Sequence, residues 1–380
     1  MQRIYLDNAA TTPLKKCVFE KMAAYLTEEY GNADSPHATG RKAMAAVDNA
    51  RDTIAAWLGA KPKEIYFTSG GTESDNWAII GAARAQKKQG RTHVLLSSIE
   101  HHAVLFAAEI LQEEGFDVEQ IPVNEGGMVA LNTVSAMIRP DTALVCVMRV
   151  NNETGIVQPV GEIAEIAHSV GALCFVDAVQ SAPHERIDVA KWKVDLLSVS
   201  SHKLHGPKGC GALYVKSGVK IERLVGGGEQ ERGLRGGTLN VPAIVGFAAA
   251  VQALDYEKSE ETIRKASEAF VEEISVLEGI SFNGNREKAI SGVLSVRVEG
   301  VENATLLYKT DLAGLSIAAG SACSSASVKP SHVLTAMNMS ERAAKESVRI
   351  SFSSLTTEEE ARTAGKIFVE CVQAVRGVQK

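Results

Sequence analysis

Residues 195–203 read Asp195-Leu196-Leu197-Ser198-Val199-Ser200-Ser201-His202-Lys203, an apolar run that ends in small and polar residues. The apolar run predicts a buried strand. Residues 205–211 come next and are rich in glycine and proline, so they continue neither as a strand nor as a helix. A second apolar run, residues 212–215, follows directly. We therefore expect Lys203 at the mouth of a sheet, in a polar turn between two buried strands.

A lysine in such a turn has two interpretations. Most single lysines are solvated surface residues. The alternative is a lysine that a rigid element holds for covalent chemistry with a carbonyl group. Lys203 taken alone favours the surface residue, whereas the adjacent Ser200, His202 and glycines, together with the motifs elsewhere in the chain, favour the alternative.

Predicted strands and helices alternate through the residues before this stretch. Short apolar runs predict the strands, and segments with helical periodicity lie between them. Such alternation is typical of an α/β fold, in which a mostly parallel sheet is covered by helices on both faces. The predicted strands cover residues 64–68, 93–97, 118–122, 143–148 and 173–176.

The pattern changes after Val215. A long glycine-rich connection comes next, and then a long helical stretch over residues 243–277, broken once, followed by fewer strands. These later elements predict a smaller α+β domain. We expect a large domain over residues 15–257 and a small domain built from residues 1–14 and 258–380.

The composition is that of an ordinary soluble protein. The 380 residues are 23% charged and 45% hydrophobic, and the net charge of −6 argues against nucleic acid or an anionic membrane as the main partner. We expect no signal peptide and no membrane span, since no apolar stretch reaches the ~18 residues that a span needs. The cysteines form no C-x-x-C pair and no zinc-type spacing, which favours a reducing, cytoplasmic setting without a metal site. They are Cys17, Cys146, Cys174, Cys210, Cys323 and Cys371, of which Cys146 and Cys174 lie in apolar runs and are expected in the core.

Small residues join the first strand of the alternating region to a helix. They read Thr68-Ser69-Gly70-Gly71-Thr72-Glu73-Ser74. Backbone N–H groups and hydroxyls at a helix N-terminus suit an anion, and Thr72 fits an N-cap. The alternative is a plain capped turn. The pattern is neither G-x-G-x-x-G nor a P-loop, so it does not indicate a nucleotide.

Two further strand ends carry polar residues. His101 follows the strand at 93–97, at the edge where an open α/β sheet contacts ligands. His102 is better explained as a residue at a helix start. Asn151 and Asn152 follow a later strand and offer amide donors and acceptors at the same edge, although a simple turn explains them too.

Asp177 ends the strongly apolar run of residues 172–176. A carboxylate there needs a cationic or hydrogen-bonding partner, because burial of an unpaired charge is costly. Lys203 lies 26 residues further on, enough for one crossover and a return to the same sheet edge. An aspartate that pairs with a protonated ring nitrogen and a lysine that forms an imine are the two residues that pyridoxal phosphate requires.

Cys323 lies in a run of small residues, 319–327, that precedes Pro330. Such a run buries little surface, so we expect an exposed, mobile loop. A free cysteine in an exposed loop is prone to oxidation unless it serves a purpose. An incidental surface thiol is the alternative.

Together these motifs resemble the cysteine desulfurases of the NifS and IscS kind, within the class V aminotransferase family of fold type I pyridoxal-phosphate enzymes. The resemblance extends from residues 5–12, Tyr-Leu-Asp-Asn-Ala-Ala-Thr-Thr, to residues 347–352, Ser-Val-Arg-Ile-Ser-Phe, and the separate motifs occur in the family's order. It implies a large domain with a mostly parallel sheet and a smaller α+β domain.

The resemblance also implies a role for individual residues. Lys203 would be the Schiff-base lysine, Asp177 would hold the pyridine nitrogen, and Gln180 the ring hydroxyl. His101 would stack on the ring and relay protons, and Cys323 would take up sulfur as a persulfide. Phosphate contacts would come from Gly71, Thr72, Ser200 and His202 and, from a neighbouring subunit, Thr238; substrate contacts would come from Asn152 and Arg349.

The implied reaction converts L-cysteine to L-alanine and passes the sulfur, as an enzyme persulfide, to an acceptor protein. The implied assembly is a homodimer. The favoured acceptor is an iron–sulfur scaffold, with a tRNA-thiolation protein as another. Rival hypotheses are a selenocysteine lyase or related carbon–sulfur lyase, an aminotransferase of the same fold, and, from another class, a non-catalytic sulfur carrier or scaffold. The intact Lys203, Asp177 and His101 speak against the last, and Cys323 against the others.

Overall fold

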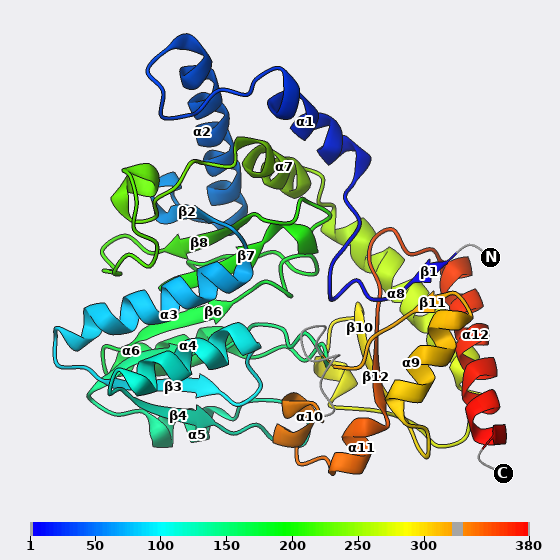
Figure 1. Ribbon diagram of the computed structural model, residues 1–380. Helices are drawn as coiled ribbons and strands as arrows, with labels where there is room; N and C mark the ends of the chain where they lie inside the picture. Colours follow the sequence, from blue (N-terminus) through cyan, green and yellow to red (C-terminus); the bar gives the residue numbers. More distant parts are fainter. Residues whose placement is uncertain (1–2, 321–329, 379–380) are drawn as a thin grey trace.

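A seven-stranded sheet forms the centre of the larger part of the molecule in the computed structural model, which describes residues 3–320 and 330–378 (Figure 1). The strand order is β2-β8-β7-β6-β5-β3-β4. The strands β3 to β7 are parallel to one another, whereas β8 runs antiparallel to both of its neighbours, β2 and β7. The strands are β2 (Ile65–Thr68), β3 (His93–Ser97), β4 (Asp117–Ile121), β5 (Thr142–Cys146), β6 (Leu173–Asp177), β7 (Leu196–Ser200) and β8 (Gly211–Val215).

Helices cover both faces of this sheet, because its strands are apolar on both sides. Neighbouring residues of a strand point to opposite faces, so Leu96 joins one core cluster and Leu95 the other. One face packs against α3 (Gly71–Lys87) and α4 (His102–Glu113). The other packs against α2 (Ala38–Leu58), α5 (Leu131–Met137), α6 (Val160–Ser169) and α7 (Val241–Gln252), with α1 (Lys16–Thr27) laid against α7.

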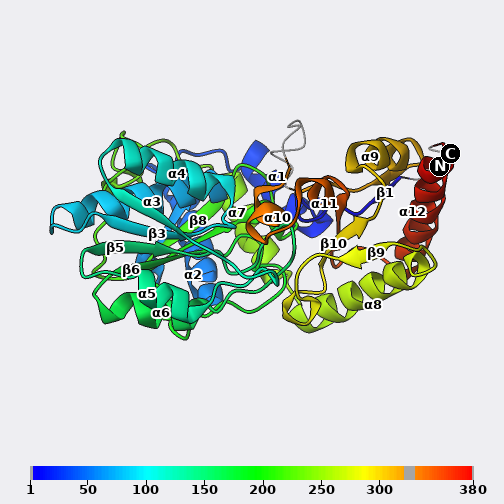
Figure 2. The ribbon, with the colours of Figure 1, turned by 90° about the horizontal axis from the view of Figure 1, so that it is seen from below.

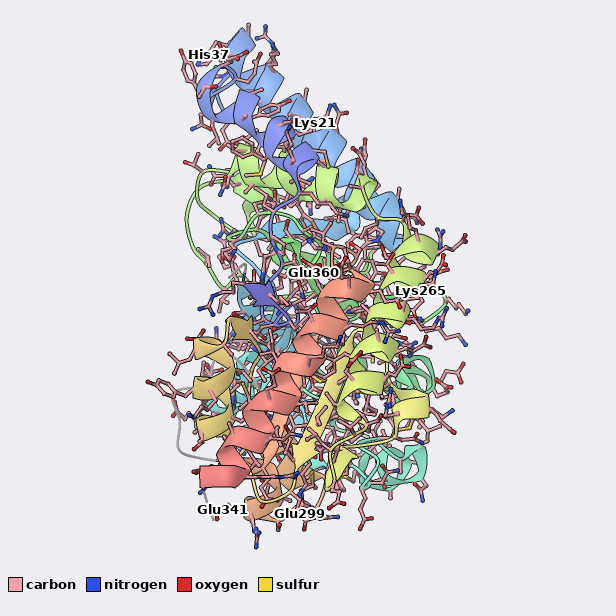
Figure 3. The ribbon with its side chains drawn as sticks, turned by 90° about the vertical axis from the view of Figure 1, so that its right-hand side faces the viewer. Lys21, His37, Lys265, Glu299, Glu341 and Glu360 are labelled. Atoms are coloured by element: carbon pink, nitrogen blue, oxygen red, sulfur yellow. The ribbon has the colours of Figure 1, made fainter. Side chains whose placement is uncertain are left out.

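A second, smaller sheet lies at the other end of the molecule (Figure 2). Its order is β12-β10-β9 and all its pairs are antiparallel. Two long helices, α8 and α12, cross its outer side next to each other (Figure 3). These elements share a separate apolar core. They are α8 (Tyr256–Ile274), β9 (Ile280–Phe282), β10 (Val293–Val298), α9 (Asn303–Leu312), β12 (Ser347–Ser351) and α12 (Glu358–Val378), with the short parallel pair β1 (Ile4–Tyr5) and β11 (Leu315–Ser316) beside them.

The predicted α/β class with a mostly parallel central sheet is confirmed. The long helical stretch over 243–277 is broken once, between α7 and α8, as expected. The strand β9 and the short helices α10 (His332–Ala336) and α11 (Glu341–Lys345) were not predicted, because each is too short to show a period. The division at residue 257 stays a prediction. Buried residues of α10 pack on the core of the large sheet rather than on that of the small one.

One prediction about a helix start was wrong. Thr72 is not the N-cap of α3, because the helix already begins at Gly71 and its N-cap is Gly70. Gly70 has φ +153° and ψ −174°, a backbone conformation that is essentially restricted to glycine. Thr72 is therefore inside the first turn, with its hydroxyl available for another partner.

Gly211, the first residue of β8, provides a test of how tightly the strand ends are packed. A Cβ there would lie 2.7 Å from the carbonyl oxygen of Val199 and 2.8 Å from the Cα of Gly70. Since both neighbours are backbone, we expect Gly211→Ala to lower the free energy of unfolding by about 1–3 kcal/mol. Gly226→Ala is the matched control, because no heavy atom of the described residues lies within 4 Å of that Cβ. Equal urea midpoints for the two variants would contradict this.

Candidate active site

The ends of five strands converge at one edge of the large sheet. β3 and β5 are neighbours there although β4 separates them in sequence, which makes the gap between them a topological switch point. Open α/β sheets bind ligands outside the carboxyl ends of their strands at such a point. The polar residues that follow β2, β3, β5, β6 and β7 in the chain therefore meet at one place.

A cavity of about 190 Å³ occupies this place. It contains every predicted site residue except two. Thr238 is exposed and does not line the cavity, and Cys323 lies outside the described residues. The predicted residues that line it are Gly71, Thr72, His101, Asn152, Asp177, Gln180, Ser200, His202, Lys203 and Arg349, and the others are Ala9, Ala10, Asp75, Met148, Val150 and Val179.

Lys203 enters the cavity from a short 3-10 helix, Ser201–Lys203, that follows β7. Its Nζ donates hydrogen bonds to the carbonyl oxygens of Ala9 and Ala10, the latter at 3.0 Å. Thr12 holds this turn from the other side, since its backbone N–H donates to the carbonyl oxygen of His202 at 3.1 Å and its Oγ1 accepts from the N–H of His205 at 2.8 Å. The N-terminal segment thus fixes the lysine as firmly as the sheet does.

Asp177 is the last residue of β6 and is buried. Its Oδ1 accepts a hydrogen bond from the backbone N–H of Val179 at 2.8 Å. Burial raises the pKa of Asp177 to about 6, against the opposing effects of that hydrogen bond and of the Lys203 charge. A carboxyl with a raised pKa at the floor of a cavity is suited to pair with a cationic ligand group.

Two polar atoms in the cavity wall are buried without a hydrogen-bond partner among the described residues. They are the Oγ of Ser200 and the Oε1 of Gln180. Native proteins rarely leave such atoms unsatisfied, so each marks a place for a ligand group. Ser200 faces the start of α3, where a Cβ on Gly71 would lie 2.9 Å from Val179 and 3.8 Å from the Cβ of Ser200. The open helix end and the Ser200 hydroxyl together are suited to an anion such as phosphate.

The two histidines of the cavity are neutral near physiological pH. Burial, with the nearby Lys203 charge, lowers the pKa of His101 to about 4 and that of His202 to about 4. His101 is the N-cap of α4, and its Nδ1 accepts from the N–H of Ala103 at 3.1 Å. His202 places its Nδ1 3.1 Å from the hydroxyl of Thr11. Because the Nδ1 of His101 already accepts a hydrogen bond, its neutral ring carries its hydrogen on Nε2, from which it can donate to a ligand.

Arg349 comes from β12 of the small sheet and reaches the same cavity. Its side chain is 2% exposed. Its Nη2 lies 2.7 Å from the carboxylate of Asp7 and its Nη1 donates to the carbonyl oxygen of Asn152 at 2.9 Å. Its Nε is buried without a hydrogen-bond partner among the described residues, so the guanidinium has an unsatisfied donor. Asp7 was missed by the sequence analysis.

Asn151 and Asn152 have different functions in the turn after β5. Asn151 is fully buried, and its Oδ1 accepts from the backbone N–H groups of Glu153 and Thr154, both at 3.0 Å. It shapes the turn, whereas Asn152 lines the cavity. Glu153, the third residue of the predicted motif, was not assigned a role. It accepts a hydrogen bond from the Ser331 hydroxyl at 2.5 Å, and its Oε2 lies 3.2 Å from the position that a Cβ on Gly320 would take.

The comparisons with known proteins agree with this geometry. The aminotransferase class-V family model matches residues 4–363. The chain is 45% identical over 378 residues to the putative cysteine desulfurase IscS 1 of Bacillus subtilis, covering 98% of this chain and 99% of the relative. It is 42% identical over 377 residues to the cysteine desulfurase IscS of Methanosarcina thermophila, covering 99% of this chain and 93% of the relative.

The chain belongs to the cysteine desulfurase family. These enzymes are pyridoxal-phosphate-dependent members of the class V aminotransferases, so the family resemblance seen in the sequence is confirmed. A solved structure described as a NifS-like protein superimposes with a TM-score of 0.92 at 35% identity, covering 98% of this chain and all of that one. The structure of SspA in complex with cysteine gives a TM-score of 0.83 at 38% identity, covering 92% and 98% of the two chains.

The described residues of this cysteine desulfurase include no helix with the length and apolar character needed to cross a bilayer. Four of its described cysteines, Cys146, Cys174, Cys210 and Cys371, are buried, and burial raises the pKa of each thiol. The core positions expected for Cys146 and Cys174 are therefore confirmed. Cys17 is the exposed one among the described cysteines.

The Asp7–Arg349 pair should stabilise this desulfurase more than a surface pair does. We expect Asp7→Asn to lower the free energy of unfolding by about 2–4 kcal/mol, because it leaves the buried Arg349 charge without its counter-ion. Asp311→Asn is the control. It breaks an exposed pair with Arg3, also between the N-terminal segment and the small sheet's end of the molecule, and should cost little. Chemical denaturation measures both. A similarly small loss of unfolding free energy in the two variants would show that Asp7 does not compensate the charge of Arg349.

Proposed function

We propose that the chain uses pyridoxal 5′-phosphate to convert L-cysteine to L-alanine and that Cys323 takes up the sulfur as a persulfide. The observation that carries this proposal is the cavity in which Lys203, Asp177 and His101 face the unsatisfied atoms of Ser200 and Gln180. The family and the relative solved with cysteine support the same substrate.

The cavity residues fit this cofactor group by group. The Ser200 hydroxyl, with Gly71, Thr72 and His202 around the start of α3, would hold the phosphate. Gln180 would satisfy the ring hydroxyl with the amide that lacks a partner. Asp177 would keep the ring nitrogen protonated through a charge-assisted hydrogen bond. Bound in this way, pyridoxal phosphate supplies the electron sink for chemistry at the substrate's α-carbon.

Lys203 and His101 supply the proton transfers in this proposal. Lys203 would anchor the cofactor and then, released by the substrate amine, move the α-proton. The carbonyl groups of Ala9 and Ala10 already bind its Nζ, so they would hold the amine in the cavity after release. His101 would relay protons at the substrate, since its neutral ring carries a hydrogen on Nε2 and takes up a second proton on Nδ1 once the hydrogen bond from Ala103 is released.

Arg349 would bind the substrate carboxylate. It is held by Asp7 and by the carbonyl oxygen of Asn152, and it keeps one unsatisfied donor. A guanidinium fixed in this way recognises a carboxylate better than a mobile lysine ammonium does. The side-chain amide of Asn152, which lines the cavity, is the second proposed substrate contact.

The described residues on either side of Cys323 support its role in this proposal. Ser331 donates a hydrogen bond to the Glu153 carboxylate, one residue after Asn152, and a Cβ added at Gly320 would lie 3.2 Å from Glu153 Oε2. Cys323 is three residues from Gly320, a reach of roughly 10 Å. In the proposed step the carbon–sulfur bond of cysteine breaks, a sulfur–sulfur bond forms at Cys323, and the carbon receives a proton to give alanine. Atoms balance as cysteine plus thiol giving alanine plus persulfide.

We further propose a cytoplasmic homodimer that hands sulfur to an acceptor protein, most simply an iron–sulfur scaffold. Thr238 supports the dimer, because it is exposed and away from its own cavity while its motif resembles a phosphate contact made across subunits. A tRNA-thiolation protein is the alternative acceptor.

The rival hypotheses differ in measurable ways. A selenocysteine lyase or a lyase that releases sulfide directly would not need Cys323. An aminotransferase would form a keto acid and no alanine from cysteine. A non-catalytic carrier would be colourless, whereas an enzyme loaded with pyridoxal phosphate is yellow.

Lys203→Ala tests the anchor. We expect loss of covalent cofactor attachment and of at least about a thousandfold in turnover, with the phosphate contacts still supporting weak binding. Borohydride reduction of the wild type followed by peptide mapping should place the pyridoxyl label on Lys203. Lys208→Ala, an exposed lysine five residues away, should keep both label and turnover. A label on another lysine would refute the assignment.

Cys323→Ser tests the sulfur transfer. The hydroxyl has nearly the size of the thiol but is a poor nucleophile toward sulfur, so alanine formation should fall at least about a hundredfold while the bound-cofactor spectrum persists. Alanine is measured together with the mass of the enzyme after a pulse of L-cysteine. Cys17→Ser, which removes an exposed thiol, should form alanine and persulfide normally. Normal alanine formation by Cys323→Ser would favour a lyase instead.

A further inference from the structure

Three buried carboxyl groups lie in or directly next to the cavity wall, although the proposed function uses only one. Asp177 is 6% exposed, Asp75 is 2% exposed and Glu100 is fully buried. Asp75 lines the cavity together with Asp177, and Glu100 directly precedes His101. Three negative charges in such a small volume would repel one another strongly.

Asp75 lies in the first turns of α3 and makes no ion pair with any described residue. Among the described residues its carboxyl is hydrogen-bonded by the hydroxyl of Ser198, which donates to Oδ1 at 2.5 Å. An ionised carboxylate with a single hydroxyl donor and no cation would be very costly at this depth. A neutral carboxylic acid is the form that this environment accepts.

Ser198 connects Asp75 to Asp177. Ser198 is the residue of β7 opposite Asp177 of β6, and its carbonyl oxygen accepts from the N–H of Ala178 at 3.1 Å. Asp75 therefore binds the side chain of Ser198, and the backbone of Ser198 binds the residue that follows β6.

Glu100, which directly precedes His101 of the cavity wall, also lacks a charged partner. Its Oε1 accepts hydrogen bonds from the hydroxyl of Ser97 and from the backbone N–H of Met148, the latter at 2.8 Å. Its Oε2 is buried without a hydrogen-bond partner among the described residues, and no described cation pairs with it. This oxygen makes no hydrogen bond that a proton on it would disrupt, so a neutral Glu100 would carry its proton there.

We propose that Asp75 is a positioning residue held as the neutral carboxylic acid, and that with Glu100, also neutral, it leaves Asp177 as the only ionised carboxyl of these three. The importance of this neutrality rests on the proposed function, in which a single carboxylate, that of Asp177, pairs with the protonated ring nitrogen of the cofactor. Its protonation states can be tested without the cofactor.

The charged and titratable groups around Asp75 act in the same direction. Burial raises the pKa of Asp75 well above its usual range, and the Asp177 and Glu100 charges raise it further, outweighing the Ser198 hydrogen bond. Burial likewise raises the pKa of Glu100 to about 8. Cys146, which faces both, is a buried thiol whose pKa is also raised. Of the three carboxyl groups, Asp177 is the one whose pKa the Lys203 charge lowers. Asp177 therefore ionises in preference to Asp75 and Glu100.

The first experiment compares the thermal stability of the full-length wild type and Asp75→Asn, both freed of cofactor, from about pH 4 to about pH 8. A carboxyl with a raised folded-state pKa stabilises the fold below its unfolded pKa of about 3.9 and loses that contribution as pH rises. Asparagine has no such loss. We therefore expect the Tm of Asp75→Asn to rise by several degrees relative to wild type as pH increases. Asp52→Asn, at an exposed position of α2, should show a flat difference.

A Tm difference that is constant with pH, or that falls as pH rises, would mean that Asp75 is ionised and would overturn the proposal. Should Asp75→Asn fail to fold, infrared spectroscopy decides. The wild type must then show the carbonyl stretching band of a buried protonated carboxyl that shifts in Ser198→Ala, which removes its hydrogen-bond donor. Absence of such a band in the wild type would equally overturn it.

The second experiment uses cofactor affinity to test whether Asp75 contributes a negative charge to the site. Asp75→Asn should bind pyridoxal phosphate within about threefold of wild type, and its bound-cofactor absorbance should keep the wild-type pH dependence, whereas Asp177→Asn should bind more than about tenfold more weakly. Equal weakening in both variants would show that Asp75 is needed as a charge and would overturn the inference. If the wild type itself does not bind the cofactor, the proposed function fails, while the stability result still stands.

Discussion

The guanidinium of Arg349 ties together the parts of the chain from which the site is built. It is buried, belongs to the small sheet, and binds Asp7 of the N-terminal segment and the carbonyl oxygen of Asn152 from the large one. A buried charge must be compensated, so these three segments have to meet wherever Arg349 is placed. The cavity therefore lies where the two sheets and the N-terminal segment are joined, and the guanidinium that joins them is part of its wall.

Strand ends explain why much of the site could be predicted from the sequence. Asp177, His101 and Lys203 each follow an apolar run, and parallel strands deliver their ends to one sheet edge. Asp7, by contrast, contacts Arg349 across 342 positions in the sequence, and no local pattern encodes such a pairing. Glu153 and Asp75 were missed for the same reason, because their partners, Ser331 and Ser198, lie in distant elements. The resemblance to a known family, rather than any pattern of spacing, supplied the roles of Gln180 and Thr238.

The start of α3 differs from the sequence prediction in one detail. We expected an anion site there with Thr72 as the helix cap. The chain uses Gly70 instead, in a conformation that side chains avoid, and places Gly71 against Val179 where no Cβ fits. Backbone N–H groups are thus left uncovered beside Ser200. Propensity rules cannot anticipate this, because the close approach comes from Val179, just after β6 and more than 100 residues further along the chain.

Charge is distributed sparingly around the cavity. Burial keeps His101 and His202 neutral, so Lys203 and Arg349 are the cations among its lining residues, and Asp177 is the carboxylate best placed to ionise. In a site of low polarity each remaining charge acts at close to full strength, since few others screen it. The start of α3 suits an anionic group, Asp177 suits a cationic ring, and Arg349 suits the carboxylate of a substrate. Additional ionised groups would weaken that correspondence, which is why the neutrality of the surrounding acids and imidazoles matters as much as the charges that remain.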